Sequence, residues 1–415
     1  MSKEIAMENF SSYITEQKNT HMTHLEDRVI YGGVNGTRQA IMALRSLRDM
    51  LAGKHDGKVS VKWDGAPAIF VGTDPSDGKF FVAKKGIFNK NPKVYKTDAD
   101  IDADTSGDLS DKLKQALKYL PELGIKGVIQ GDFLFGPGDL SNETIEGEKY
   151  ITFHPNTILY AVPESSESSK PIRTSKIGIV WHTTYTGDTF ESMKASYGVD
   201  VSKFKKSKNV WSQDAMLTDL SKVATMGKND TEEVNDYLSQ AGRIFNQING
   251  TTLRSLEANP ELSRLIEMYN NSFVRTGTIV TNTEKHVDGL IRWINARFQK
   301  EADKRKTEKG KAAQYTKRDE VLKFFSNQNK KSLKLMFDLQ KMLVLAKLKL
   351  INILNRLSKT KHFVKTRNGY ATTGPEGYVA IDKLGGDAVK IVDRMEFSYN
   401  NFSPEILKGW DKPSR

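Results

Sequence analysis

Cysteine is absent from the 415 residues of the chain. Disulfide bonds, thiolate zinc sites and cysteine nucleophiles are therefore excluded, and the composition fits a reducing compartment. A continuous apolar run of roughly 20 residues, the length that spans a bilayer, is also missing. Residues 1–13 lack a basic stretch followed by an apolar stretch, so no secretory signal is expected. These absences favour a cytoplasmic protein without a membrane partner, located in the host cytoplasm if the chain is viral.

The remaining composition is that of an ordinary soluble protein with an unusual distribution of charge. Hydrophobic residues make up 38% of the chain, charged residues make up 27%, and the net charge is +12. The segment from Arg292 to Lys361 holds 20 Lys/Arg and 6 Asp/Glu, a local excess of +14 that leaves the remainder slightly acidic. Such an excess suggests a polyanionic partner, most often nucleic acid. The alternative is a solvated basic surface that braces the protein or contacts another protein.

The hydrophobic periodicity divides the chain into β-rich and helical parts. Helical spacing is expected at residues 24–53 and 108–120, and strands are expected at 58–72, 79–84, 128–135, 151–162 and 177–184. Further helices are predicted at residues 215–248, 252–276, 284–309 and 317–359, followed by strand-like sequence at 377–381 and 388–397. The pattern predicts an α+β domain with mostly antiparallel sheet, formed by residues 1–190 and 362–415. A large all-α, basic insertion is expected at residues 191–361.

One lysine lies where a strand gives way to a tight turn. Lys62 ends the apolar run Val59-Ser60-Val61 and is followed by Asp64-Gly65. Partial desolvation at the end of a strand would lower the pKa of the amine and make its neutral, nucleophilic form accessible. The alternative interpretation is a plain β-hairpin turn with an exposed lysine.

Four further short segments follow Lys62 in order. They are Val128–Leu134 with Gly131-Asp132, Ile177–His182 with Trp181, Pro375–Val379 with Glu376-Gly377, and Val389–Arg394 with Lys390. Together with Lys62-x-Asp64-Gly65, they resemble the motifs of the covalent nucleotidyltransferases, the superfamily of ATP-dependent polynucleotide ligases and messenger-RNA capping enzymes. The resemblance covers about residues 58–190 and 365–398. Residues 19–27 are also similar to ligase-like proteins of large tailed phages.

The resemblance implies an antiparallel-sheet nucleotidyltransferase domain with an ATP-grasp-like ligase fold. In such a domain Lys62 attacks the α-phosphate of ATP and forms lysyl-AMP, with Mg²⁺ or Mn²⁺ as the cation. Asp64, Gly65 and Lys84 would belong to the nucleotide site. The choice of ATP over GTP comes from the resemblance alone, because no residue pattern reads the base.

Four other residues receive roles in the same interpretation. Asp132 and Glu376 are carboxylates that can hold Mg²⁺, its waters or a ribose hydroxyl, and the resemblance gives the ribose to Asp132 and the metal to Glu376. Lys390 would neutralise the α-phosphate as pyrophosphate leaves, and Trp181 would stack on the purine. The alternatives are a turn-capping role for Asp132, a plain turn at Glu376 and a core position for Trp181. The neighbouring His182, like His154, is given no role.

The sequence departs from the superfamily in three places, one of which is Asp132, where glutamate is common. Ala66-Pro67-Ala68 stand where DNA ligases carry an arginine, and Lys84 or Lys85 is the candidate to replace that cation. Only 21 residues follow Arg394, too few for the C-terminal OB-fold of DNA ligases and capping enzymes. The pattern is therefore closer to the RNA-ligase branch.

The sequence thus favours an ATP-dependent RNA ligase that joins 5′-phosphate and 3′-hydroxyl ends, with the basic helices holding RNA. A second hypothesis keeps the lysyl-nucleotide but changes the acceptor to nicked DNA, a protein or a small molecule. A third is a non-catalytic virion or nucleic-acid-binding protein built on a degenerate ligase fold.

Overall fold

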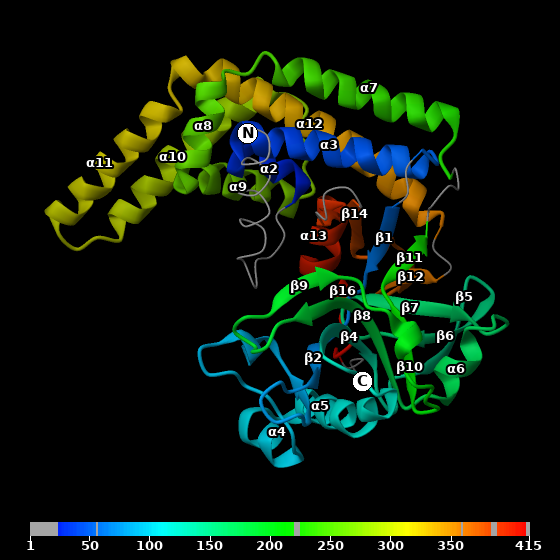
Figure 1. The fold of residues 1–415 in the computed structure, drawn as a ribbon. Helices are drawn as coiled ribbons and strands as arrows, with labels where there is room; N and C mark the ends of the chain where they lie inside the picture. Colours follow the sequence, from blue (N-terminus) through cyan, green and yellow to red (C-terminus); the bar gives the residue numbers. More distant parts are fainter. Residues whose placement is uncertain (1–23, 55–56, 220–224, 358–359, 383–387, 412–415) are drawn as a thin grey trace, which may run out of the picture.

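The structure is a computed structural model that describes residues 24–54, 57–219, 225–357, 360–382 and 388–411. In these residues a layer of long helices lies over a β-rich part that contains three sheets (Figure 1). Every strand pairing in the sheets is antiparallel except that of β10 with β8. The prediction of a mixed fold with mostly antiparallel sheet is confirmed. No helix in the described residues is both long and apolar enough to cross a membrane. Residues 19–23 of the phage-like segment lie outside the described residues.

The first sheet carries Lys62. Its strands, in order across the sheet, are β11 (Met216–Asp219), β1 (Gly57–Lys62), β14 (Gly377–Asp382) and β15 (Ala388–Ile391). Lys62 lies opposite Gly377, and Val379 lies opposite Lys390. Because directly opposed residues share a face of an antiparallel sheet, Lys62 and Lys390 lie on the same face. The other face contributes Val59, Val61, Tyr378 and Ile391 to the same hydrophobic core as the helices α3 (Gly33–Leu51) and α12 (Asn327–Asn355).

The second sheet carries Asp132. Its strands are β10 (Val210–Asp214), β8 (Ile177–Thr186), β4 (Val128–Phe135), β2 (Ala68–Thr73) and β3 (Phe80–Ala83), with β9 (Lys194–Tyr197) beside β8. One face is covered by α5 (Gly107–Tyr119), whose Leu113 and Ala116 pack against Ile129 and Phe133 of β4. Asp132 points to the opposite face by the alternation of the strand. The short elements η2 (Lys85–Phe88), α4 (Asp98–Asp104), η3 (Leu120–Leu123) and η4 (Val201–Lys203) complete this part.

The third sheet joins the middle of the chain to its C-terminal part. Its strands are β13 (Gly369–Thr372), β12 (Lys361–Thr366), β7 (Ile158–Pro163), β6 (Glu148–Phe153) and β5 (Ser141–Ile145), with β16 (Ile406–Leu407) beside β12. The helices α6 (Ser169–Thr174) and α13 (Arg394–Phe402) flank it in sequence. Pairing of β12 with β7 brings residues 361–364 against residues 158–161. Strands that follow residue 360 therefore pair with strands of the first 163 residues, β12 with β7 and β14 with β1.

The helical layer contains N-terminal as well as central residues. It consists of η1 (Leu25–Asp27), α2 (Arg28–Tyr31), α3 (Gly33–Leu51), α7 (Lys228–Phe245), α8 (Gly250–Ala258), α9 (Pro260–Arg275), α10 (Thr283–Asp303), α11 (Glu308–Phe324) and α12 (Asn327–Asn355). In α12, Leu339, Leu343, Ala346, Leu350 and Leu354 recur at helical spacing and are fully buried. They pack with α3 and α7, which makes α12 the central helix of the layer.

The predicted boundary of the helical segment is wrong at its start. Residues 194–219 form β9, β10 and β11, which join the first two sheets, and helix begins only at Lys228. These strands have four or five residues each, too few for a period of two to stand out in the sequence. The helix predicted at 317–359 is also interrupted, because α11 ends at Phe324 and α12 begins at Asn327. The N-terminal helices, expected in the α+β part, pack on the helical layer instead.

A buried cluster of charges ties the N-terminal segment to α12 and α13. Lys347 is 1% exposed, and its Nζ lies 2.7 Å from Oε2 of Glu26. Arg394, the first residue of α13, lies 3.0 Å from Oδ2 of Asp27 and also donates to Asn271 at 2.7 Å. Burial alone would raise the pKa of Glu26, but Lys347 beside it lowers that pKa to about 2. The carboxylate is therefore held ionised in the protein interior.

We expect Lys347→Met to lower the free energy of unfolding by about 3–5 kcal/mol, because it removes the nearer of the two cations beside the buried Glu26 carboxylate and leaves Arg394, whose Nη1 lies 3.8 Å from Oε1. The double variant Lys347→Met/Glu26→Gln should recover a large part of the loss, since no uncompensated charge remains. Urea unfolding followed by circular dichroism measures both. A double variant no more stable than the single one would show that the pair contributes through shape rather than charge.

Candidate active site

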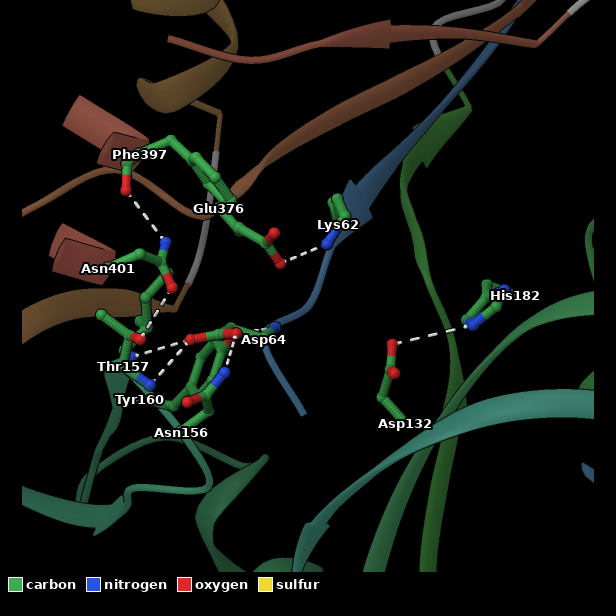
Figure 2. A network of polar contacts seen from close by, with 11 residues as sticks. Lys62, Asp64, Asp132, Asn156, Thr157, Tyr160, His182, Glu376, Phe397 and Asn401 are labelled. Atoms are coloured by element: carbon green, nitrogen blue, oxygen red, sulfur yellow. Dashed lines mark hydrogen bonds and ion pairs between the residues drawn. The ribbon is translucent and has the colours of Figure 1, made fainter. Parts of the chain in front are cut away.

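Lys62 ends strand β1 and meets a carboxylate from the far end of the sequence. Its Nζ forms an ion pair and hydrogen bond with Oε2 of Glu376, 314 residues away (Figure 2). The register explains the encounter, because Lys62 lies opposite Gly377 and Glu376 directly precedes β14. The Lys62 side chain is 34% exposed and that of Glu376 is 11% exposed. Burial raises the pKa of Glu376, against the opposing effect of Lys62.

The interpretation of residues 58–72 as a hairpin is excluded by the sheet topology. Strands β1 and β2 belong to different sheets, so the chain crosses between sheets at Asp64-Gly65. A Cβ on Gly65 would lie 2.4 Å from Cβ of Asp132, which explains why this position needs glycine. The backbone N–H of Ala66 then donates to the carbonyl of Phe133 at 2.9 Å. Gly65 thus brings the end of β1 directly against Asp132.

Asp64 fixes the turn to the third sheet. Its carboxylate is 6% exposed and accepts from Nδ2 of Asn156 at 2.7 Å and from the backbone N–H groups of Thr157 and Ile158 at 2.8 and 3.1 Å. Its own backbone N–H donates to the hydroxyl of Tyr160 at 2.6 Å (Figure 2). The carboxylate is therefore already satisfied by protein donors. We correct its predicted nucleotide-binding role to one of holding Lys62 in place.

Asp132 belongs to β4 and lies on the side of the site that faces Lys62. Burial raises the pKa of Asp132 to about 7, with Glu376 and Asp64 adding to the increase and Lys62 opposing it. These mutual effects show that Asp132, Lys62 and Glu376 form one electrostatic group. Near neutral pH the Asp132 carboxyl is poised between its two protonation states.

Lys390 joins the group from β15. Its Nζ lies 5.5 Å from the centre of the Phe397 ring, and burial lowers its pKa, with the positive charge of Lys62 as the next cause. Asp393, three residues later, caps α13 by accepting from the N–H groups of Met395 and Glu396 at 3.0 and 3.2 Å. The structure thus brings together Lys62, Asp132, Glu376 and Lys390, as the sequence predicted.

The prediction for Trp181 is wrong. Its side chain is fully buried on the α5 side of the second sheet, and its Nε1 donates to Oγ of Ser212 at 2.7 Å. Gly131 makes room for this ring, since a Cβ there would lie 2.6 Å from Cε3 of Trp181. Successive residues of a strand point to opposite faces, so the neighbour that reaches the site is His182.

His182 is the site residue that sequence reasoning missed. Its Nε2 lies 3.7 Å from Oδ2 of Asp132, and its Nδ1 lies 2.7 Å from Oγ1 of Thr183 (Figure 2). Burial, with the charge of Lys62, lowers the pKa of His182 to about 4, so the ring is neutral at pH 7. The alternation along β8 would have selected His182 once Trp181 was assigned to the core.

Lys84 is not brought to this group. It follows β3, and its Nζ lies 3.1 Å from Oδ2 of Asp104 in α4 and 5.8 Å from the centre of the Tyr95 ring. Lys93 and Tyr95 also contact the Asp104 carboxylate, at 2.5 and 2.6 Å. Lys84 therefore fixes α4 against the second sheet, and its predicted nucleotide-binding role has no support in this geometry.

Residues 19–406 match the family described as a family of unknown function, DUF6267. The chain belongs to DUF6267. The match runs through the helical layer and all three sheets, so every residue of the candidate site lies within the DUF6267 region. No curated protein and no solved structure matches the chain. Any activity of this DUF6267 protein must therefore be inferred from the site itself.

The carboxylates of the DUF6267 site can serve a magnesium nucleotide but not a metal held by protein alone. No group of three or more His, Asp or Glu side chains in the described part of the chain is arranged to hold a metal. Mg²⁺ bound with a nucleotide needs only one or two carboxylates, because phosphates and waters complete its coordination. Glu376 fits that requirement best, since its only contact in the group is with Lys62 and the oxygens of Asp64 are occupied.

Asp132→Asn should stabilise the protein at pH 8, which is the reverse of what most buried substitutions do. The folded state keeps the Asp132 proton up to about pH 7, whereas an unfolded chain loses it near the ordinary value of 3.8. Stability therefore falls as pH rises between these values, by on the order of 4 kcal/mol. Asparagine does not ionise, so the Asp132→Asn protein has no such loss of stability. Its gain in free energy of unfolding over the parent should be largest above pH 7 and small near pH 4.

Urea unfolding of both proteins at pH 5 and pH 8 measures this difference. Asp188→Asn, at an exposed aspartate, is the matched control and should give no pH-dependent gain. An Asp132→Asn protein that is less stable than the parent at pH 8 would contradict the assignment of a desolvated carboxyl.

Proposed function

We propose that this protein is an ATP-dependent nucleotidyltransferase that forms lysyl-AMP on Lys62 and acts as an RNA ligase on 5′-phosphate and 3′-hydroxyl ends. The observation that carries the proposal is the Lys62–Glu376 ion pair, with Asp132 and Lys390 electrostatically coupled to it. These residues come from β1, β4, β15 and the segment before β14, and they are four that the motif resemblance selects. A lysine surrounded by carboxylates and a second lysine suits attack on a phosphoanhydride.

The first step forms a bond between Nζ of Lys62 and the α-phosphorus of ATP. The bond from that phosphorus to the bridging oxygen breaks, and pyrophosphate leaves with the electron pair. The amine loses its proton, and the carboxylates of Glu376 and Asp132 are the groups that can accept it, since burial raises both of their pKa values. Mg²⁺, held by the phosphates and Glu376, would offset the charge of the triphosphate.

Lys390 supports this step by its charge. It lies on the same face of the first sheet as Lys62, so its ammonium group can reach the α-phosphate that Lys62 attacks. A fixed cation at this point stabilises the negative charge that develops on the phosphate oxygens. The Asp132 carboxyl and the neutral His182 ring are on the facing side and can contact the nucleoside.

Two further transfers complete the proposed reaction. An oxygen of an RNA 5′-phosphate attacks the phosphorus of the adenylyl group, and Lys62 leaves and recovers a proton. A 3′-hydroxyl then attacks the activated 5′-phosphate, a phosphodiester forms, and AMP leaves. One ATP is converted to AMP and pyrophosphate for each bond made.

In this proposal the sheets and the helices have different roles. The nucleotidyltransferase domain comprises the three sheets, built mainly from residues 57–219 and 361–407. The helices from Lys228 to Asn355 are the insertion, and their cationic surface holds the RNA. The preference for ATP and for RNA is taken from the motif resemblance.

The test uses purified protein with Mg²⁺, or Mn²⁺, and ATP labelled at either the α- or the γ-phosphate. Protein should retain the α-label and not the γ-label, because pyrophosphate departs. A 5′-phosphorylated RNA should then remove the label and yield joined product. Failure to label the protein with any of the four nucleoside triphosphates would refute the proposal. A labelled protein that joins no RNA would point to nicked DNA or another acceptor.

A further inference from the structure

A groove lies in the helical layer between α9, α10 and α11, and no residue of the group around Lys62 lines it. Its volume is about 550 Å³. Leu265 and Phe298 lie at its floor and are only 6% and 7% exposed, whereas Met268 is partly exposed. Arg264 and Arg297 line it from α9 and α10, and both are exposed. We call this feature the α9–α11 groove.

The two arginines of the groove keep their hydrogen-bonding capacity. Among the described residues neither guanidinium has a hydrogen-bonded or ion-paired acceptor, and Arg297 only lies over the Trp293 ring at 5.6 Å. A guanidinium presents a fork of N–H donors that matches the oxygens of a phosphate. Two such forks beside one apolar surface are complementary to a chain of alternating phosphates and bases.

The carboxylates of the groove do not oppose an anion, because each is paired with a lysine. Glu261 lies 2.7 Å from Nζ of Lys317, and Glu301 lies 2.8 Å from Nζ of Lys304. The groove also lies at the start of the segment in which Lys and Arg outnumber Asp and Glu by 14. Its surroundings therefore attract polyanions.

The outer wall of the groove is α11, a helix that buries almost none of its side chains. In α11 the only buried residue is Val321, and the helix packs mainly on α10 (Figure 1). A helix that is polar nearly all round does not stabilise a fold by burying apolar surface. The α10–α11 hairpin instead forms an arm that encloses one side of the groove and carries exposed Lys304, Arg305 and Lys306 where its two helices meet.

We propose that the α9–α11 groove binds a single-stranded segment of RNA, with Arg264 and Arg297 on backbone phosphates and a base against the apolar floor at the partly exposed Met268. The choice of RNA rests on the proposed function, whereas the contacts with phosphate and base do not. The volume lies within the range of roughly 300–1,000 Å³ that holds a compact organic ligand, so it admits a nucleotide or two and excludes a duplex. RNA bound here is held well away from its reacting end, which means that the substrate is a long strand rather than a short oligomer.

The test measures binding of a fluorescein-labelled, unstructured single-stranded RNA to the full chain by fluorescence anisotropy over a range of salt concentrations. Arg264→Glu/Arg297→Glu should weaken binding by about 10-fold or more and reduce the salt slope by about 1.4, because each lost phosphate contact on a single strand contributes about 0.7. The matched control Arg305→Glu/Lys306→Glu changes the net charge equally at two exposed residues that do not line the groove and leaves the Lys304–Glu301 pair intact, so its loss should stay within about 3-fold.

Equal losses of RNA affinity in the two double variants would overturn the proposal that RNA binds in the groove and would indicate binding to a diffuse cationic surface. Absence of RNA binding by the parent protein would overturn it as well, as would tighter binding of duplex than of single strand. Binding of single-stranded DNA alone, with no RNA bound, would overturn the choice of RNA. Arg264→Gln/Arg297→Gln, checked by thermal melting, separates a loss of contact from a loss of fold.

The same preparations separate this inference from the proposed function. Labelling of Lys62 by ATP should be unaffected in both double variants, since no groove residue contacts the Lys62 group. Normal RNA binding with no labelling would leave the groove in place and refute the ligase. Normal labelling with equal RNA binding in the parent and the groove variant would support the nucleotidyltransferase and refute RNA binding in the groove.

Discussion

Lys62→Ala should abolish transfer of AMP to the protein, to below the limit of detection. The amine is the proposed nucleophile, and no other described residue of the group can replace it at the end of β1, because Lys390 lies on a different strand. Lys62→Arg should fail equally, since a guanidinium remains protonated in proteins and is not a nucleophile. Protein-bound label from α-labelled ATP, measured after denaturing electrophoresis, reports the loss.

The fold should survive the Lys62 substitutions. Lys62 is partly exposed, and burial already raises the pKa of its partner Glu376, so the carboxyl can take up a proton when the ammonium is removed. Lys361→Ala, at an exposed lysine on β12, is the matched control and should label normally. Labelling of the Lys62→Ala protein at an appreciable rate would remove Lys62 from the mechanism.

Glu376→Ala and Lys390→Ala should each slow labelling by about 10²-fold or more, equivalent to about 2.7 kcal/mol of activation free energy. The Glu376→Ala protein would lack the carboxylate that contacts the Lys62 ammonium and that would hold the metal. The Lys390→Ala protein would lack the positive charge next to the α-phosphate. Single-turnover rates at saturating ATP isolate the chemical step from nucleotide binding.

Two surface substitutions control for charge and position in that experiment. Glu405→Ala and Lys361→Ala remove one exposed carboxylate and one exposed ammonium from the C-terminal part of the chain. Both should label at the rate of the parent protein. Near-normal rates for Glu376→Ala and Lys390→Ala would mean that the C-terminal motif residues lie near Lys62 only for structural reasons.

The sequence predicted the parts of the site that follow from strand ends and motif order. The motif pattern selects Lys62, Asp132, Glu376 and Lys390, and the structure brings all four together. The central strands were also located, with β4 and β8 found within two residues of their observed ends. Long apolar stripes and clear alternation carry enough signal for such elements.

The errors come from information that a single segment does not contain. Which face of β8 meets the site depends on α5 covering the other face, so Trp181 and His182 could not be told apart by their own segment. Asp64 resembles a ligand-binding residue until Asn156 is known to occupy its carboxylate. Lys84 forms an ion pair with Asp104 instead of joining the group around Lys62. Asp104 belongs to the short helix α4, which no sequence motif marks.

The helical layer is connected to the candidate site by charge as well as by packing. Arg394 joins the buried Asp27 and lies four residues after Lys390, and α13 continues from it beside Glu376. Lys347 and Glu26 complete the connection to α12. Arg394 also donates to Asn271 of α9 at 2.7 Å, so α13, which follows the strand of Lys390, is hydrogen-bonded to one of the helices that line the groove.

The central claim is that Lys62 carries a nucleotide covalently. Mass spectrometry of the intact protein after incubation with ATP and Mg²⁺, followed by peptide mapping, tests it most directly. We predict a mass increase of one adenylyl group per chain, located on Lys62 and reversed by added pyrophosphate. An unchanged mass, or an adenylyl group mapped to any other residue, would contradict it.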